Sequence, residues 1–231
     1  MSRQLPLSLG LQHAPSLDDF VVGRNEAVID ALDRALDGSG ERVVFLTGPP
    51  FSGRSHLLMG QCSAAQARGL QSAYVPLGQH PDLAPAILDG LEDLDLIAID
   101  DVHCTAARLP WEQALFALFN RCLDHDTRLL FSADRGPAAL PLRLPDLRSR
   151  LASGLTLALK PLDDQGRLAL LQCLAVRHAL TLPDEVARYV LTHSSRDPGD
   201  LIDTIQRLDR ASLAEQRRLT IPFVRDLLHQ G

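Results

Sequence analysis

The stretch RVVFLTGPPFSGRS, from Arg42 to Ser55, decides the fold that we expect for this chain. The apolar run before Gly48 is typical of a buried β-strand. It leads into GPPFSGRS, which fits the phosphate-binding pattern G-x-x-x-x-G-K-[ST] except that Arg54 replaces the Lys. The helical pattern that follows places the loop between a strand and a helix, where phosphate-binding loops lie. The alternative is a Gly/Pro turn that only ends the strand.

The loop would hold a phosphate group through its backbone. Its amides and the N-terminus of the following helix offer hydrogen-bond donors to an anion. Gly48 and Gly53 allow close backbone approach, and Ser55 is placed to offer its hydroxyl to Mg²⁺. The predicted nucleotide-binding residues of the loop are Gly48, Pro49, Pro50, Phe51, Ser52, Gly53, Arg54, Ser55 and His56.

Arg54 keeps the positive charge of the usual Lys but not its shape. A guanidinium is planar and bidentate, whereas an ammonium is compact. It can hold phosphates without sitting correctly on a developing transition state, so we expect nucleotide binding rather than fast hydrolysis. The alternative explanation is compositional, because Lys160 is the only Lys in the chain.

Two further segments end in acids. LDLIAIDD (94–101) is almost wholly apolar until Asp100 and Asp101, which places two carboxylates beside the phosphate loop. Asp100 would hold the Mg²⁺ shell, and Asp101 could polarise an attacking water. FSAD (131–134) brings Asp134 near the place of a γ-phosphate, where it could sense the bound nucleotide. All three acids also fit the alternative of ordinary turn residues.

Strands alternate with helices up to about residue 160, which predicts βαβ units and a parallel sheet. The expected strands are 42–48, 72–77, 94–101, 128–134 and 155–162, and the expected helices among them are 25–36, 55–69 and 111–124. Helical periodicity then dominates, in 163–179, 184–194, 199–214 and 222–229. We therefore predict an N-terminal segment 1–15, an α/β domain 16–160 with a five-stranded parallel sheet flanked by helices, and a small all-helical domain 161–231.

Composition excludes several classes of protein. The net charge of −6 and the absence of a basic block argue against a protein that grips DNA through its phosphates. The four cysteines, Cys62, Cys104, Cys122 and Cys173, form no C-x-x-C pair, so we expect reduced structural residues rather than a zinc site. No signal peptide or membrane-spanning run is visible, so we expect a cytoplasmic protein without a membrane partner.

Taken together, these motifs resemble those of AAA+ ATPases, and more narrowly the bacterial replication initiator DnaA and the Hda family, its regulatory inactivators. The similarity covers about residues 16–229. In chain order it runs through DDFVVGRNEAV, LDLIAIDDV, SADRGP, LRSRLASGL, KPLDDQGRLALL and RASLAEQRRLTIPFVRDLL. The Arg in the phosphate loop, the short start QLPLSL, and the lack of the initiator's oligomerisation and helix-turn-helix domains resemble the Hda family.

The resemblance implies a function: promoting hydrolysis of initiator-bound ATP, together with the DNA-loaded sliding clamp, which prevents re-initiation of replication. It also implies that Val21 and Val22 line the adenine of a bound ADP or ATP. Arg150 matches the arginine finger, which is presented to a neighbour's γ-phosphate, whereas Arg148 is a weaker match. The alternative for Arg150 is a surface salt bridge to Asp146 or another acid.

The N-terminal segment resembles peptides that dock into the sliding clamp. It combines one polar residue with several apolar anchors, as in extended peptides whose side chains fill pockets. These residues are Gln4, Leu5, Leu7 and Leu9. Contact with DNA would then be mainly indirect, through the clamp, with nucleoid association as a consequence. The alternative is a frayed terminus whose Leu side chains pack on the domain.

One position departs from the initiator pattern. An Arg that faces the phosphates in the initiator family aligns here with Gly199, and Arg196 lies nearby as a substitute. Holding a diphosphate nucleotide is therefore at least as plausible as cycling ATP. Two other functions stay open: a self-sufficient ATPase acting as a loader, and a DNA-binding initiator-like protein. The sequence also leaves homodimerisation open.

Overall fold

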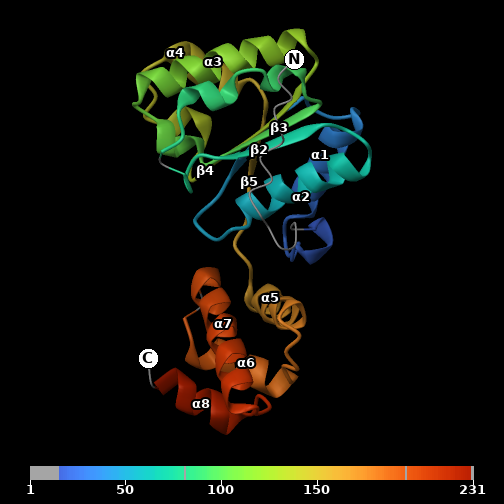
Figure 1. Ribbon diagram of the computed structural model, residues 1–231, viewed down its shortest axis with the longest axis vertical. Helices are drawn as coiled ribbons and strands as arrows, with labels where there is room; N and C mark the ends of the chain where they lie inside the picture. Colours follow the sequence, from blue (N-terminus) through green and yellow to red (C-terminus); the bar gives the residue numbers. More distant parts are fainter. Residues whose placement is uncertain (1–15, 81, 196, 230–231) are drawn as a thin grey trace. The chain divides into compact units, whose positions relative to one another are not determined.

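The structure, a computed structural model, describes residues 16–80, 82–195 and 197–229. The chain folds as two compact units (Figure 1). In the described chain, one unit holds residues 16–20 and Asn25–Lys160, and the other holds Val21–Arg24 and the residues from Pro161 onward. The first unit has an apolar core on each face of its sheet, and the second has a core of its own.

The first unit is built on a five-stranded sheet in the order β2-β3-β4-β1-β5, and all the pairings are parallel. The strands are β1 (Val43–Thr47), β2 (Ser72–Pro76), β3 (Leu96–Asp100), β4 (Arg128–Ala133) and β5 (Leu155–Ala158). This confirms the predicted five-stranded parallel sheet. Because all strands run the same way, the phosphate loop after β1 and the acids at or just after the ends of β3 and β4 lie at one edge of the sheet.

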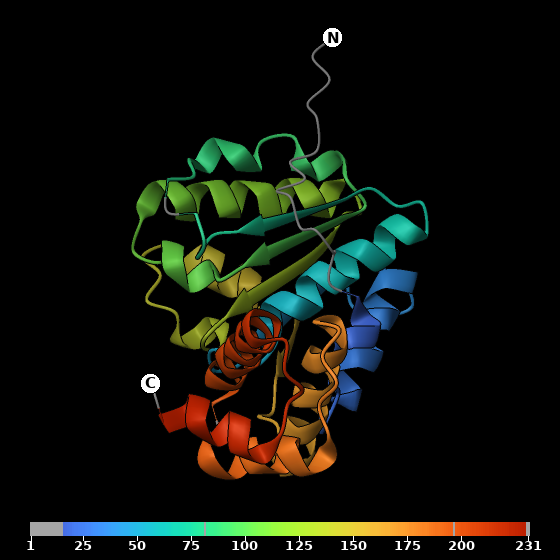
Figure 2. The same ribbon diagram turned by 60° about the horizontal axis from the view of Figure 1, so that its bottom comes forward.

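Helices cover both faces of this sheet. They are α1 (Glu26–Asp37), α2 (Arg54–Ala67), α3 (Leu109–Asp124) and α4 (Pro145–Ala152). Figures 1 and 2 show α3 and α4 on one face and α1 and α2 on the other. The alternation along β1 follows this layering, because Phe45 packs in the core of α3 and α4 while Val44 and Leu46 pack in that of α1 and α2.

Most elements lie where their periodicity predicted them. Gly38, with φ 85°, ends α1. The helix α4 was not predicted. It has eight residues and only two buried apolar positions, Leu147 and Leu151, which is too short a repeat to separate from a loop. The RSR motif was therefore recognisable in the sequence, whereas the helix that carries it was not.

The second unit is helical, as predicted. Its helices are α5 (Asp164–Arg177), α6 (Asp184–His193), α7 (Pro198–Glu215) and α8 (Ile221–His229). Their apolar faces meet in a separate core around Leu171, Val190 and Ile205. Two of them begin at an acidic cap: the Asp163 carboxylate accepts from the Gly166 amide (2.9 Å), and that of Asp197 from the Gly199 amide (2.8 Å).

The four cysteines are free thiols. Cys62 and Cys122 are buried, and this burial raises the pKa of each thiol to about 12, so both stay protonated near neutral pH. Within the ranges that the structure describes, no helix is long and apolar enough to cross a membrane.

Asn25 ties the start of α1 to the chain just after β5. It is only 3% exposed, and its side chain donates to the Lys160 carbonyl (3.1 Å) and accepts from the Lys160 amide (2.7 Å). Asn25→Ala leaves both backbone groups without this partner, so we expect a loss of about 1–3 kcal/mol in the free energy of unfolding. Urea denaturation measures it. The exposed control Gln66→Ala should change stability by less than about 0.5 kcal/mol; equal effects would contradict this role.

Candidate functional site

The loop Gly48–Ser55 joins β1 to α2, the strand–loop–helix arrangement of a phosphate-binding loop. At two positions of the loop, Gly48 and Gly53, a side chain would come too close to neighbouring atoms. Gly53 has φ 93°, and a Cβ there would lie 2.6 Å from Cε2 of Phe20. A Cβ on Gly48 would lie 2.7 Å from the Ser52 hydroxyl. The loop therefore keeps its backbone open to close approach.

The loop presents donors that suit an anion. The N-terminus of the 14-residue α2 has Gly53 as its cap, which offers no side-chain acceptor to the first amides. The Ser52 hydroxyl is buried and has no hydrogen-bond partner among the described residues. Phe51 has φ 56°, and its side chain is 61% exposed. These features fit a bound phosphate group.

Arg54 turns back across the loop. One guanidinium nitrogen, Nη1, donates to the Gly48 carbonyl, and the other, Nη2, donates to Oδ1 of Asp101 (2.9 Å). The two side chains are 10% and 23% exposed, so the ion pair is partly shielded from solvent. Arg54 thus joins the phosphate loop to the end of β3, and it neutralises the acid that we expected to polarise water.

Asp100 is held differently. It is 1% exposed, its Oδ2 accepts from the Tyr74 hydroxyl (2.7 Å) and its Oδ1 accepts from the Ser132 hydroxyl. The pKa of Tyr74 is raised by burial and then by the Asp100 charge. The predicted Mg²⁺ ligand Asp100 is therefore held in place by hydroxyl groups from both neighbouring strands.

Tyr74 and Ser132 were not predicted as site residues. Each is a polar residue in a mostly apolar strand, β2 or β4, and that was the available signal. Ser132 also accepts from the Asp101 amide (2.9 Å). The register pairs Tyr74 with Ala98, two residues before Asp100, so strand pairing brings the phenol to the acid.

Asp101 lies in the left-handed region, with φ 56°. Burial and the neighbouring Asp100 raise its pKa more than Arg54 and His103 lower it. Asp134, after β4, accepts two hydrogen bonds from Arg135 (2.9 and 2.7 Å), which hold its pKa below the usual value. His103 Nδ1 lies 3.8 Å from Asp101 Oδ1 and 4.0 Å from Asp134 Oδ1. The three predicted acids thus gather at one sheet edge.

His56 does not direct its ring at the loop. Its Nε2 lies 2.9 Å from the Ser16 carbonyl, and its ring centroid is 5.8 Å from that of Phe20. Its predicted part in phosphate binding falls to its backbone amide. Among the described residues, no group of three or more His, Cys, Asp or Glu side chains forms a metal cluster. Ser55 and Asp100 suit Mg²⁺ that is shared with nucleotide phosphates, which needs few protein ligands.

The two arginines of the RSR motif differ in their surroundings. Arg148 is half-buried, and its Nη2 donates to the Leu142 carbonyl (2.6 Å), so it braces the start of α4. Arg150 is exposed, and its guanidinium carbon lies 6.0 Å from the Phe119 ring centroid. Within the described chain its guanidinium forms no ion pair, including none with Asp146.

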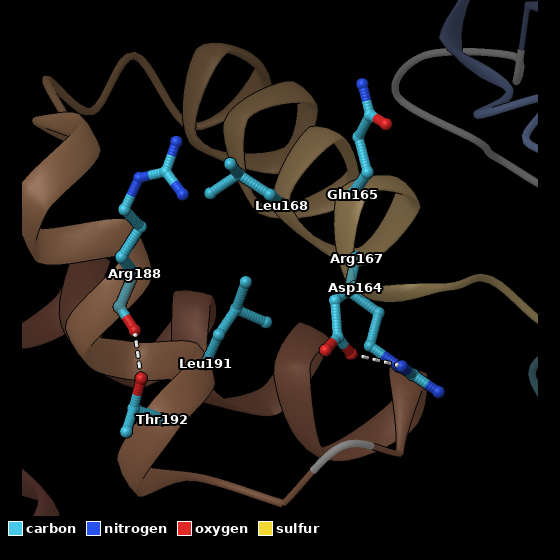
Figure 3. A pocket seen from close by; sticks show the side chains of 7 residues that line it. All are labelled: Asp164, Gln165, Arg167, Leu168, Arg188, Leu191 and Thr192. Carbon is cyan, nitrogen blue, oxygen red and sulfur yellow. Dashed lines mark hydrogen bonds and ion pairs between the residues drawn. The ribbon is translucent and has the colours of Figure 1, made fainter.

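The second unit holds the remaining predicted positions. Val21 and Val22 are half-buried there, and Gly199 is buried in the first turn of α7. A pocket of about 620 Å³ opens between α5 and α6 (Figure 3). Its lining residues are Asp164, Gln165, Arg167, Leu168, Arg188, Leu191 and Thr192. Gln4, Leu5, Leu7, Leu9 and Arg196 lie outside the described residues.

Comparisons with known proteins agree with this arrangement. Residues 84–158 match the bacterial DnaA ATPase domain, and residues 164–228 match the Hda lid domain. Domain III of the Thermotoga maritima replication initiation protein DnaA has a similar structure (TM-score 0.82, 22% identity, 96% of this chain and 98% of that chain).

Two other solved structures share the fold. AMPPCP-bound DnaA from Aquifex aeolicus has a TM-score of 0.68 and 23% identity, over 83% of this chain and 63% of that chain. The Thermotoga maritima RuvB Holliday junction branch migration motor has a TM-score of 0.69 and 21% identity, over 93% of this chain and 71% of that chain.

The parallel sheet, the phosphate loop after β1, the acids at the end of β3 and the helical second unit define an AAA+ protein. The match of the helical unit is to Hda. The chain is an Hda-like AAA+ protein related to DnaA.

Tyr74 gives this site a test. Tyr74→Phe removes the hydroxyl that links β2 to the predicted Mg²⁺ ligand Asp100, so we expect the affinity for Mg²⁺ in the nucleotide complex to fall about tenfold, as for other outer-shell ligands. Titration of Mg²⁺ against a fluorescent ADP complex measures it. Tyr189→Phe, in the second unit, is the matched control and should leave the titration unchanged. Unchanged Mg²⁺ affinity in Tyr74→Phe would exclude this link.

Proposed function

We propose that this protein is a regulator of replication initiation that stimulates hydrolysis of DnaA-bound ATP by supplying Arg150 as an arginine finger in trans. The observation that carries the proposal is the contrast between two arginines. Arg150 stands exposed on α4 and unpaired in the described chain, whereas Arg54 is paired with Asp101 inside the protein's own site. This pairing suits a site that holds a nucleotide, whereas the exposed Arg150 is free of ion pairs among the described residues and can contact another molecule.

An exposed guanidinium on a fixed helix suits this chemistry. Phosphoryl transfer spreads negative charge over the γ-phosphate oxygens, and an added Arg raises rates by about 10³–10⁵. The finger must come from a neighbouring molecule, so it has to be on the surface. Arg150 meets this requirement, and Arg148 does not because its guanidinium is bound to the Leu142 carbonyl.

The protein's own site would hold ADP or ATP with Mg²⁺. The amides at the start of α2 would bind the phosphates, Ser55 and Asp100 would hold Mg²⁺, and Val21 and Val22 would line the adenine. Bound Mg²⁺ would offset the phosphate charge. The AMPPCP-bound relatives support nucleotide binding. Within the chain, residues 16–160 would be the nucleotide domain and 161–231 the lid.

Partners complete the proposal. The initiator is DnaA, and the DNA-loaded sliding clamp would hold the protein near it through Gln4, Leu5, Leu7 and Leu9. DNA contact would be mainly indirect, which agrees with the net charge of −6. The result would be fewer ATP-bound initiators and therefore less re-initiation in a cytoplasmic, nucleoid-associated setting. A homodimer of the protein would hide or present Arg150 according to its geometry.

Arg150→Ala tests the finger. In a mixture of initiator–ATP, loaded clamp, DNA and this protein, we expect the stimulated hydrolysis rate to fall by about 10³-fold or to the unstimulated level. The matched control is Arg143→Ala, another exposed arginine close to α4, which should keep full stimulation. Changing Gln4 and Leu5 to Ala should weaken stimulation by raising the protein concentration that is required. If Arg150→Ala stimulates like the natural chain, the finger assignment is wrong.

A self-sufficient ATPase is the second candidate, because Asp101 lies beside the phosphate loop where a water activator would act. Arg54→Lys separates the two functions. Lys is shorter than Arg and carries one ammonium in place of the two guanidinium nitrogens that contact the Gly48 carbonyl and Asp101, so it holds Asp101 less firmly and leaves this carboxylate more available as a base.

We expect the natural chain to turn ATP over slowly by itself and Arg54→Lys to raise this rate by up to about 10²-fold, the lower end of what a general base contributes. Steady-state phosphate release from the isolated protein measures it, and Arg54→Lys/Asp101→Asn is the control that should return to the low rate. Robust turnover by the natural chain would instead favour the ATPase.

A further inference from the structure

Among the residues that the structure describes, one buried carboxylate has no part in the proposed nucleotide site. Glu112 lies in the first turn of α3 and is 0% exposed. No Arg, Lys or His among the described residues forms an ion pair with it. A carboxylate without a cation is costly to bury unless backbone donors surround it.

Three backbone amides donate hydrogen bonds to the buried Glu112 carboxylate. Oε1 of Glu112 accepts from the amides of Ala107 (2.8 Å) and Arg143 (3.2 Å), and Oε2 accepts from the amide of Leu144 (2.7 Å). Ala107 precedes α3 and has φ 63°, so one bond fixes a left-handed turn. The other two reach 31 and 32 residues along the chain. One side chain thus fastens two distant segments together.

The distant segment leads directly into the finger helix. Leu144 is the N-cap residue of α4, and its own side chain caps nothing. The carboxylate of Glu112 therefore supplies an anion where the helix begins, six residues before Arg150. Because α4 has only eight residues, its start and its packed residues Leu147 and Leu151 decide where each exposed side chain stands.

We infer that Glu112 is a positioning residue for Arg150. It acts through the backbone, because its carboxylate binds the amides of Arg143 and Leu144 and so holds this segment against α3. The position of this segment determines where α4 begins, and therefore where the Arg150 guanidinium meets a neighbour's phosphate. The guanidinium carbon of Arg150 lies 6.0 Å from the ring centroid of Phe119, which is in α3. Glu112 and the residue nearest the Arg150 guanidinium therefore belong to the same helix. The inference rests on the proposed function, because it assigns Glu112 a role only if Arg150 is the finger.

Glu112→Gln keeps the volume but replaces one acceptor oxygen by an NH₂ donor, which faces backbone amides that are also donors. In the mixture of initiator–ATP, loaded clamp and DNA, we expect the maximal stimulated rate to fall at least tenfold. The concentration of protein that gives half of the maximal stimulation should stay within twofold, because the binding surface is intact. A merely structural role would lower the melting temperature and leave the maximal rate per folded molecule unchanged.

The control is Glu92→Gln. Glu92 is also partly buried against α3, where it pairs with Arg121 (2.8 Å) near the opposite end of the helix. It should keep the maximal rate. Should Glu112→Gln not fold, as judged by circular dichroism, Leu144→Pro takes its place. It removes one amide donor and the partly buried Leu144 side chain but leaves the carboxylate, and Leu144→Ala, which keeps the amide, is its control for the lost packing.

Three results decide between the claims. Loss of maximal rate in both Arg150→Ala and Glu112→Gln, with Glu92→Gln normal, supports the inference. Loss in Arg150→Ala with a folded Glu112→Gln, or its Leu144→Pro replacement, within twofold of the natural chain overturns the inference and leaves the proposed function standing. Full stimulation by Arg150→Ala overturns both.

Discussion

Two adjacent carboxylates at the end of a fully buried strand constrain the whole site. Asp100 is the last residue of the otherwise apolar β3 and Asp101 follows it, and burying such charges is unfavourable unless each finds donors. The chain solves this in two ways. Hydroxyl groups from the neighbouring strands bind Asp100, while Arg54 from the phosphate loop binds Asp101. The replacement of the usual Lys by Arg then has a structural consequence, because a guanidinium can bind the loop and the acid at once.

The same principle organises the finger helix. Glu112 is a buried carboxylate that is compensated by backbone amides instead of hydroxyls or a guanidinium, and the amides it binds are those before α4. Buried acids thus fix both the site that would hold a nucleotide and the helix that would deliver Arg150. Asp101 in the protein's own site is paired with Arg54, whereas Arg150 forms no ion pair among the described residues. This is the arrangement expected of a protein whose chemistry takes place on a partner.

The sequence predicted the layered fold because its strands are continuous apolar runs and its loop and acids stand at recognisable positions along them. It could not predict that Arg54 pairs with Asp101, because that partner lies 47 residues away and the choice depends on side-chain direction. Tyr74 was missed because a single hydroxyl in a strand looks like ordinary amphipathicity. The helix α4 was missed because its eight residues carry too little periodicity. The roles assigned to Arg150, Asp134 and the N-terminal residues stay predictions.

The central claim is that the ATP hydrolysed belongs to the partner. The most direct measurement loads the initiator with ATP labelled at the γ-phosphate and this protein with the non-hydrolysable analogue AMPPCP, and follows single-turnover release of label in the presence of loaded clamp. We predict release at the same stimulated rate as with ADP in this protein's site. If release stops when this site cannot hydrolyse its nucleotide, the chemistry depends on the protein's own phosphate loop, and the proposed function is wrong.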